Sequence, residues 1–137
     1  MDIHCSLPKN KMDVASVELF KSISDTEIEP MIPALLEWMQ DINWPIAFPI
    51  AKLLINHHRI VESYIAKVLA PELDDGIWKY NLLSYLLMNW PEPPINASLV
   101  NEIIRIASNP TEEEKREEVS LMAKELLQKY SDIRNIQ

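Results

Sequence analysis

The chain has 137 residues, of which 47% are hydrophobic and 25% are charged, so it can bury a core and fold as one domain over residues 1–137. Its 13 basic and 21 acidic residues give a net charge of −8, a sign that repels phosphate backbones and excludes nucleic acid from the expected partners. One glycine beside ten prolines disfavours a β-sandwich or barrel, whose turns need several glycines.

The cysteine content and the hydropathy pattern favour a cytoplasmic protein. The one cysteine, Cys5, cannot form a disulfide within the chain, so no oxidising compartment is implied. Residues 1–11 contain no apolar run of signal-peptide length. The longest mostly apolar run, residues 42–55, is shorter than the roughly 20 residues that span a bilayer. We therefore expect no membrane partner.

The first half of the chain begins with an irregular arm and continues in helical periodicity. Residues 1–12 have no repeating apolar pattern, and a first helix is predicted over residues 14–23. A Ser-x-x-Glu capping box opens a second helical segment over residues 24–40, with a kink expected near Pro30. Pro45 suits the first position of a third helix.

The second half repeats this pattern, and prolines and acidic turns separate its helices. The helices predicted there cover residues 60–69, 77–89, 96–108 and about 110–130. Asp74-Asp75-Gly76 is expected to turn the chain and to cap the helix that follows. No stretch shows the alternation of a β-strand, so the sequence predicts about seven helices joined by short loops.

Two parts of the chain resemble each other. Leu53-Leu54 and Leu86-Leu87 lie 33 residues apart, and Trp44 and Trp78 lie 34 residues apart. A third helix pair, residues 99–127, has the same layout without the tryptophan. One helix pair cannot bury its apolar face alone, whereas stacked pairs share a continuous core. The predicted fold is therefore all-α, an α-α superhelix of stacked helix pairs.

One of these units resembles a known repeat. Residues 33–54 have an apolar first helix, a turn at Asp41 and an apolar second helix, and this stretch resembles a HEAT repeat. It departs from that pattern at Ala47, where an arginine often stands, so the usual Asp–Arg turn ladder is absent. The resemblance implies a HEAT-like stack in which partners bind the face formed by the second helices.

Four further motifs carry a second resemblance, which covers nearly the whole chain. They are Leu7-Pro8-Lys9-Asn10-Lys11, residues 36–45, Trp78-Lys79-Tyr80 and Asn109-Pro110-Thr111-Glu112. With them the chain resembles a family of small bacterial all-helical domains catalogued as of unknown function. That resemblance implies a helical fold and assigns no activity.

The polar motifs do not point to catalysis, a metal or a cofactor. The glutamates of residues 112–118 lie at a helix start, where negative charge suits the helix dipole. Asp74-Asp75-Gly76 lacks the alternating oxygen ligands of an EF-hand. His57 and His58 are neighbours, and neighbouring side chains on a helix point about 100° apart. We expect no enzyme activity, no cofactor and no metal site.

The large aromatic residues are the candidate partner-binding side chains. Trp44, Phe48, Trp78 and Tyr80 lie at or near the starts of the second helices, where they could form one aromatic patch. The alternative is that Trp44 and Trp78 are core residues wedged between neighbouring repeats. Trp90, in a proline-rich linker, is expected to cover the edge of the core.

The sequence therefore favours a non-enzymatic protein-protein interaction module with an acidic rim, whose partner is a protein or peptide. Two alternatives stay open. One is an immunity-type protein that neutralises a basic toxin, and the other is a small-ligand binder or enzyme with a pocket between repeats, around His57, His58 and Trp78. The sequence also leaves open whether a homodimer covers the aromatic face.

Overall fold

The structure is a computed structural model, and it describes residues 10, 17 and 22–136. Every regular element within these residues is helical, which confirms the all-α class. The expected N-terminal arm and most of the first predicted helix lie outside the described residues. In chain order the elements are α2 (Asp25–Ile28), η2 (Glu29–Met31), α3 (Ile32–Glu37), η3 (Trp38–Gln40), α4 (Ala47–Asn56), α5 (His58–Leu69), α6 (Gly76–Asn81), η4 (Leu82–Leu86), η5 (Leu87–Asn89), α7 (Ala97–Ser108), α8 (Glu112–Arg116) and α9 (Val119–Ile136).

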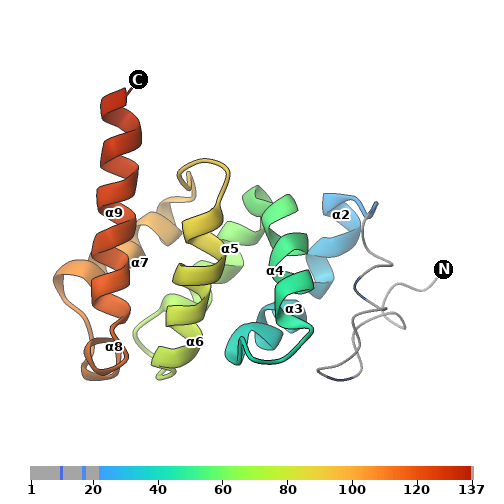
Figure 1. The fold of residues 1–137 in the computed structure, drawn as a ribbon, viewed down its shortest axis with the longest axis horizontal. Coiled ribbons are helices and arrows are strands. Elements are labelled where there is room, and N and C mark those ends of the chain that lie inside the picture. The colour runs from blue at the N-terminus through green and yellow to red at the C-terminus, as the bar shows by residue number, and fades with distance from the viewer. Residues whose placement is uncertain (1–9, 11–16, 18–21, 137) are drawn as a thin grey trace.

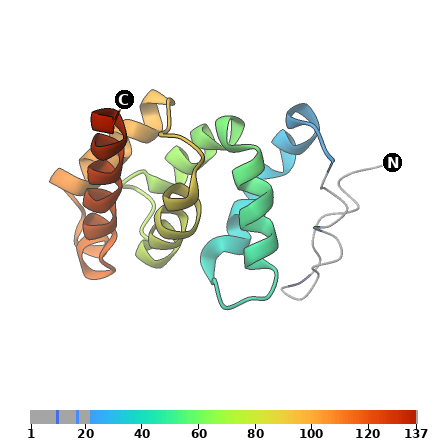
Figure 2. The same ribbon diagram turned by 45° about the horizontal axis from the view of Figure 1, so that its top comes forward.

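The helices form two rows (Figures 1 and 2). In the view of Figure 1, α4, the continuous stretch from α6 to η5, and α9 lie in front, and α3, α5 and α7 lie behind them. The packing follows the same order, because α7 packs on both α5 and α9, and η4 packs on both α4 and α9. The second helix of each predicted pair therefore contributes to one face. The HEAT-like superhelix stays a prediction.

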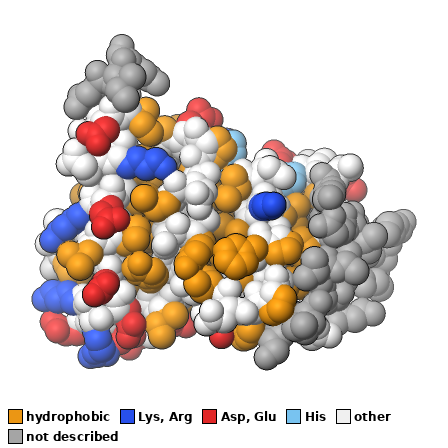
Figure 3. Space-filling model, in the orientation of Figure 1, with side chains coloured by type: hydrophobic (Ala, Val, Ile, Leu, Met, Phe, Trp, Pro, Cys, Tyr) orange, Lys and Arg blue, Asp and Glu red, His pale blue; other side chains and the backbone are white. Residues whose placement is uncertain are grey.

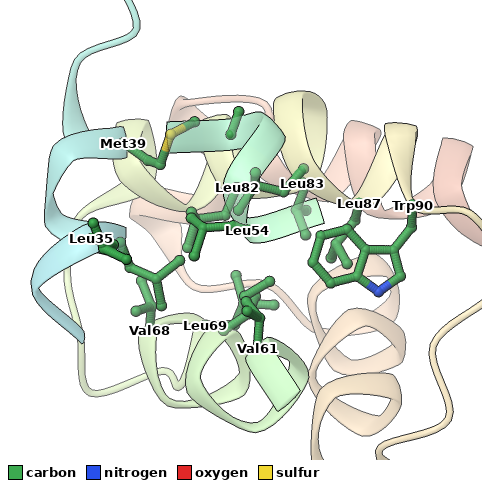
Figure 4. Close-up of a cluster of buried hydrophobic side chains, with 14 of the residues drawn as sticks. Leu35, Met39, Leu54, Val61, Val68, Leu69, Leu82, Leu83, Leu87 and Trp90 are labelled. Atoms are coloured by element: carbon green, nitrogen blue, oxygen red, sulfur yellow. The ribbon is translucent and has the colours of Figure 1, made fainter. Parts of the chain in front are cut away.

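One apolar core runs between the two rows. Figure 4 shows side chains from α3, α4, α5, η4 and η5 meeting in it, together with the indole of Trp90. Leu54, Leu69 and Leu82 have no exposed surface, and Trp90 is only 5% exposed. Trp90 therefore belongs to the core, at the end of the helical stretch that begins at Gly76.

The start of the described chain follows the predicted capping and kinking. The Glu27 N–H donates to Ser24 Oγ at 3.2 Å, and the Glu27 carboxylate accepts from the Ser24 N–H in return. A 3₁₀ turn over Glu29–Met31 contains Pro30 and separates α2 from α3. The predicted kink near Pro30 is confirmed. The ring removes a backbone donor there, and the chain adopts the tighter turn instead.

The single helix predicted over residues 110–130 is wrong, because the chain breaks between α8 and α9. Glu118 stands at the break with a φ of 61°, in the left-handed region that side chains other than glycine rarely adopt. The reason is that Glu114 and the apolar stripe of α9 are both buried. At about 100° per residue, Ala123 would lie on the opposite side of one straight helix from Glu114. The break lets both enter the interior.

Gly76 begins α6 at a close contact with the end of α8. The predicted turn is confirmed at Asp75, whose side chain accepts from the Trp78 N–H at 3.0 Å. Gly76 itself does not have a positive φ. A Cβ at this position would lie 2.7 Å from Glu117 Cγ and 3.0 Å from the Glu113 carbonyl oxygen. Glycine is therefore required by the approach of α8, not by the turn.

Candidate functional site

Trp78, one of the four predicted aromatic residues, joins two neighbouring helix pairs. Its indole N–H donates to the Leu36 carbonyl oxygen at 2.9 Å. One turn later on the same helix, the Asn81 amide donates to the Met39 carbonyl at 2.9 Å and to the Gln40 carbonyl at 3.2 Å. These side chains bind backbone carbonyls near the end of the α3–η3 segment. Trp78 therefore serves the packing of α6 against α3.

Trp44 is half-buried beside another tryptophan. Its ring meets Trp38 edge to face, with 5.5 Å between the ring centroids and 73° between the planes. Both residues pack against the core. This contact joins the turn before α4 to η3 of the same helix pair, so Trp44 is less available to a partner than an isolated surface ring.

Phe48, unlike Trp44, is exposed to solvent. Its side chain is 58% exposed on α4, and its ring lies 6.1 Å from the ring of Tyr85 on η4, at 81° between the planes. Tyr80, on α6, is half-buried. The predicted set is thus divided between two environments, and Tyr85 joins Phe48 without having been predicted. The five-residue π-helical turn Leu82–Leu86 carries Tyr85, and a regular helical pattern does not reveal such a turn.

Phe48 and Tyr85 belong to α4 and η4, two of the elements on the face toward the viewer in Figure 1. Figure 3 shows this face with hydrophobic side chains gathered over its middle, over α4 and the η4–η5 stretch. Charged side chains of both signs lie instead over α8 and α9. We call Phe48, which is exposed, and Tyr85, which is half-buried, together with the surrounding surface of α4 and η4, the aromatic face.

Two hollows lie at the start of α6, one on each side of Ile77. One encloses about 390 Å³ and is lined by Ile77, Tyr80, Arg116, Glu117 and Glu118. The other encloses about 340 Å³ and is lined by Gln40, Asp41, Ile42, Asn43, Ile77 and Asn81. Ile77 lines both and is itself 54% exposed. We call this pair of hollows the Ile77 groove.

Beneath this groove, a buried carboxylate holds two cations. Glu114 has no exposed surface; its Oε2 accepts from Lys79 Nζ at 2.7 Å and from the Arg105 guanidinium at 2.8 Å. Burial alone would raise the pKa of Glu114. Hydrogen bonds from Arg105, Lys79 and the Thr111 N–H outweigh burial, and the pKa is lowered to about 2. Arg105 also donates to the carbonyl of Leu69, the last residue of α5, and Lys79 to that of the next residue, Ala70, so this cluster joins α5, α6, α7 and α8.

A second buried carboxylate, Glu62 on α5, organises the entry to α7. It accepts from the N–H groups of Ile95 and Asn96 at 3.0 and 2.9 Å, and from the Trp90 indole at 3.1 Å. Arg59 donates to it at 3.0 Å from one turn away. Sequence reasoning missed that both carboxylates are buried, because partners such as Lys79 and Trp90 come from distant positions in the chain.

The two histidines of the alternative ligand pocket face different partners. His57 Nδ1 lies 2.5 Å from Asp25 Oδ1, whereas His58 Nε2 lies 3.5 Å from Glu92 Oε1. Hydrogen bonds from Arg59 and His58 lower the pKa of Glu92. Neither hollow of the Ile77 groove is lined by a histidine. Across the described part of the chain, no three His, Cys, Asp or Glu side chains gather closely enough to hold a metal ion.

The fold and these surfaces define an all-helical protein whose helices form two rows, with Phe48 exposed on the front row. A family model described as "Domain of unknown function (DUF5071)" matches residues 6–127. The chain belongs to this family, which confirms the resemblance to a helical family of unknown function. A search of curated proteins finds no match to the chain. Among the helices of the described residues, none is long and apolar enough to cross a membrane.

Proposed function

We propose that the protein is a non-enzymatic interaction module whose protein or peptide partner binds the aromatic face. The observation that carries the proposal is the exposed Phe48 ring, which lies beside the half-buried Tyr85 ring on a neighbouring helix of the front row. More than half of the Phe48 side chain faces solvent, so the core does not require it. Aromatic side chains anchor protein interfaces because they bury a large area with few rotatable bonds.

The helices that bear the pair are held in place by contacts on their inner side. Trp78 and Asn81 hold α6 on the α3–η3 segment, and α4 packs against both η3 and η4. A rigid support reduces the ordering cost of binding, so a larger part of the contact energy appears as affinity. This support and the exposure of Phe48 favour the aromatic face over the predicted patch around Trp44 and Trp78, which are both half-buried.

The test compares Phe48→Ser with Ile95→Ser. Ile95 is 73% exposed and lies in the loop before α7, outside the aromatic face, so it is a matched apolar control. Partners are captured from the native cell with the unaltered protein, purified, and titrated against all three forms. We expect Phe48→Ser to weaken binding by about 30-fold or more, the loss of about 2 kcal/mol typical of an interface anchor.

Thermal unfolding of the variants provides the control for this experiment, because it shows whether each variant is folded. Because Phe48 and Ile95 are both exposed, we expect the two variants to unfold at nearly the same temperature as the parent. Equal affinity of Phe48→Ser and Ile95→Ser for the captured partner contradicts the proposal. So does the failure of the unaltered protein to retain any partner.

A further inference from the structure

The Ile77 groove is lined by three apolar side chains, which we call its floor. Ile42, Ile77 and Tyr80 line its two hollows, and Ile77 stands between them with 54% of its surface exposed. Its neighbours in sequence are directed inward, since Trp78 bonds to Leu36 and Lys79 is only 1% exposed. An exposed isoleucine between two hollows offers apolar contact to a segment laid across it.

The charges around this floor are mostly negative. Asp41 lines one hollow, and Glu117 and Glu118 line the other. Arg116 is the one cation among the lining residues, and its guanidinium is paired with Glu113 at 2.5 Å. Of the other cations near these residues in sequence, Lys79 is buried against Glu114 and Lys115 is paired with Glu112. The groove is therefore apolar at its centre and acidic at both ends.

We propose that the Ile77 groove binds a lysine- or arginine-rich segment of a partner protein. The occupant follows from charge complementarity: the carboxylates at both ends attract cationic heads, and the net charge of −8 adds to this attraction. The aliphatic stems of Lys and Arg cover apolar surface while their heads stay polar, which matches Ile77 between acidic ends. A cation can also lie over the Tyr80 ring.

This inference rests on the proposed interaction role and names the chemistry of the partner. Nucleic acids and anionic lipid surfaces carry the charge that the groove repels, so they are not its ligands. A second copy of this chain carries the same net charge and is repelled as well. A basic protein segment is the occupant that both the apolar floor and the acidic ends fit.

The probe is a library of random dodecapeptides displayed on phage and selected on the full-length protein. We expect the selected sequences to be enriched in Lys and Arg. A synthetic peptide of the selected sequence should bind at least tenfold more weakly to Ile77→Arg than to the parent. The matched control is Ile104→Arg, since Ile104 is 46% exposed on α7, in the other row of helices.

A second pair of variants tests the charges without altering the floor. Replacing both Glu117 and Glu118 by Gln should weaken peptide binding and reduce its dependence on salt concentration, whereas Glu125→Gln, at an exposed position of α9, should change neither. The proposal is overturned by a library that yields no binders, by selected sequences without basic enrichment, or by equal binding to the two isoleucine variants.

The two proposals fail separately. Phe48 does not line the groove, so Phe48→Ser should leave binding of the selected peptide unchanged. If a captured partner is lost with Phe48→Ser while no peptide responds to Ile77→Arg, the interaction role stands and the groove proposal is wrong. If the peptide responds to Ile77→Arg and no partner responds to Phe48→Ser, the groove is the docking site and the aromatic face is not.

Discussion

Glu62 and Glu114 are both buried carboxylates, and different partners compensate the charge of each. Glu114 is held by two cations, Lys79 and Arg105. Glu62 is held mainly by neutral donors, two backbone N–H groups and the Trp90 indole, with one cation, Arg59. Neither carboxylate is exposed. A charge of this kind is tolerated in the interior only when hydrogen bonds and opposite charges replace its water.

The two carboxylates hold different parts of the molecule in place. The Glu114 cluster joins side chains of α6, α7 and α8, so it determines how whole helices meet at the end where the Ile77 groove lies. Glu62 binds the backbone at the start of α7, so it determines the path of one linker. The Glu114 cluster therefore positions a surface, and Glu62 positions the start of α7.

Removing the charge of Glu114 should have the largest effect on stability. Glu114→Gln leaves Lys79 buried without its anion, and breaking a buried pair in this way costs about 3–5 kcal/mol. Glu62→Gln should cost less, about 1–3 kcal/mol, because Arg59 is partly exposed and keeps water as an alternative partner. Urea unfolding of both variants measures the difference. Equal losses would mean that the kind of partner does not matter here.

The second largest effect is the pH dependence that Glu114 gives to the stability of the fold. The folded pKa of Glu114, about 2, lies below its ordinary value of 4.5, so between these values the unfolded chain binds more protons than the folded one. The stabilisation is present above about pH 4.5 and is lost as the pH falls toward 2. Unfolding free energies measured across this range should therefore decline with falling pH. In Glu114→Gln the decline should be shallower, and an unchanged slope would contradict the assignment.

The smallest expected effect concerns the turn that places Glu114. Glu118 has a φ of 61°, and a residue with a side chain pays roughly 1 kcal/mol for that conformation. Glu118→Gly should therefore raise the free energy of unfolding by up to about 1 kcal/mol, less the entropy that glycine adds to the unfolded chain. Glu125→Gly, within α9, should lower it by a similar amount. Thermal unfolding of the two variants measures the contrast.

Local patterns predicted most of the helices but not the interior charges. Prolines, capping boxes and apolar spacing act over a few residues, and the boundaries near Pro30, Asp75 and Asn96 follow from them. The break at Glu118 does not, because it depends on Glu114 meeting Lys79, 35 residues away in sequence. A glutamate in a capping box looks the same in sequence whether it faces solvent or a buried lysine.

The residues of the candidate site were likewise predicted only in part. Phe48 and Tyr80 were singled out as aromatic residues near helix starts, and the structure shows Phe48 exposed and Tyr80 lining the Ile77 groove. Tyr85 was missed because the π-helical turn that carries it has no signature in apolar spacing. Ile77 was missed because exposure cannot be inferred for an isoleucine at the start of an apolar helix.

Gly76 allows two helices to approach closely because it has no side chain. The chain has one glycine, and it lies where the start of α6 meets the end of α8. Any side chain there would push Glu117 outward, and Ile77 and Glu117 line the same hollow. The width of the groove is thus set by the absence of one methyl group. A chain that shares this groove should be recognisable by a glycine directly before its exposed apolar residue.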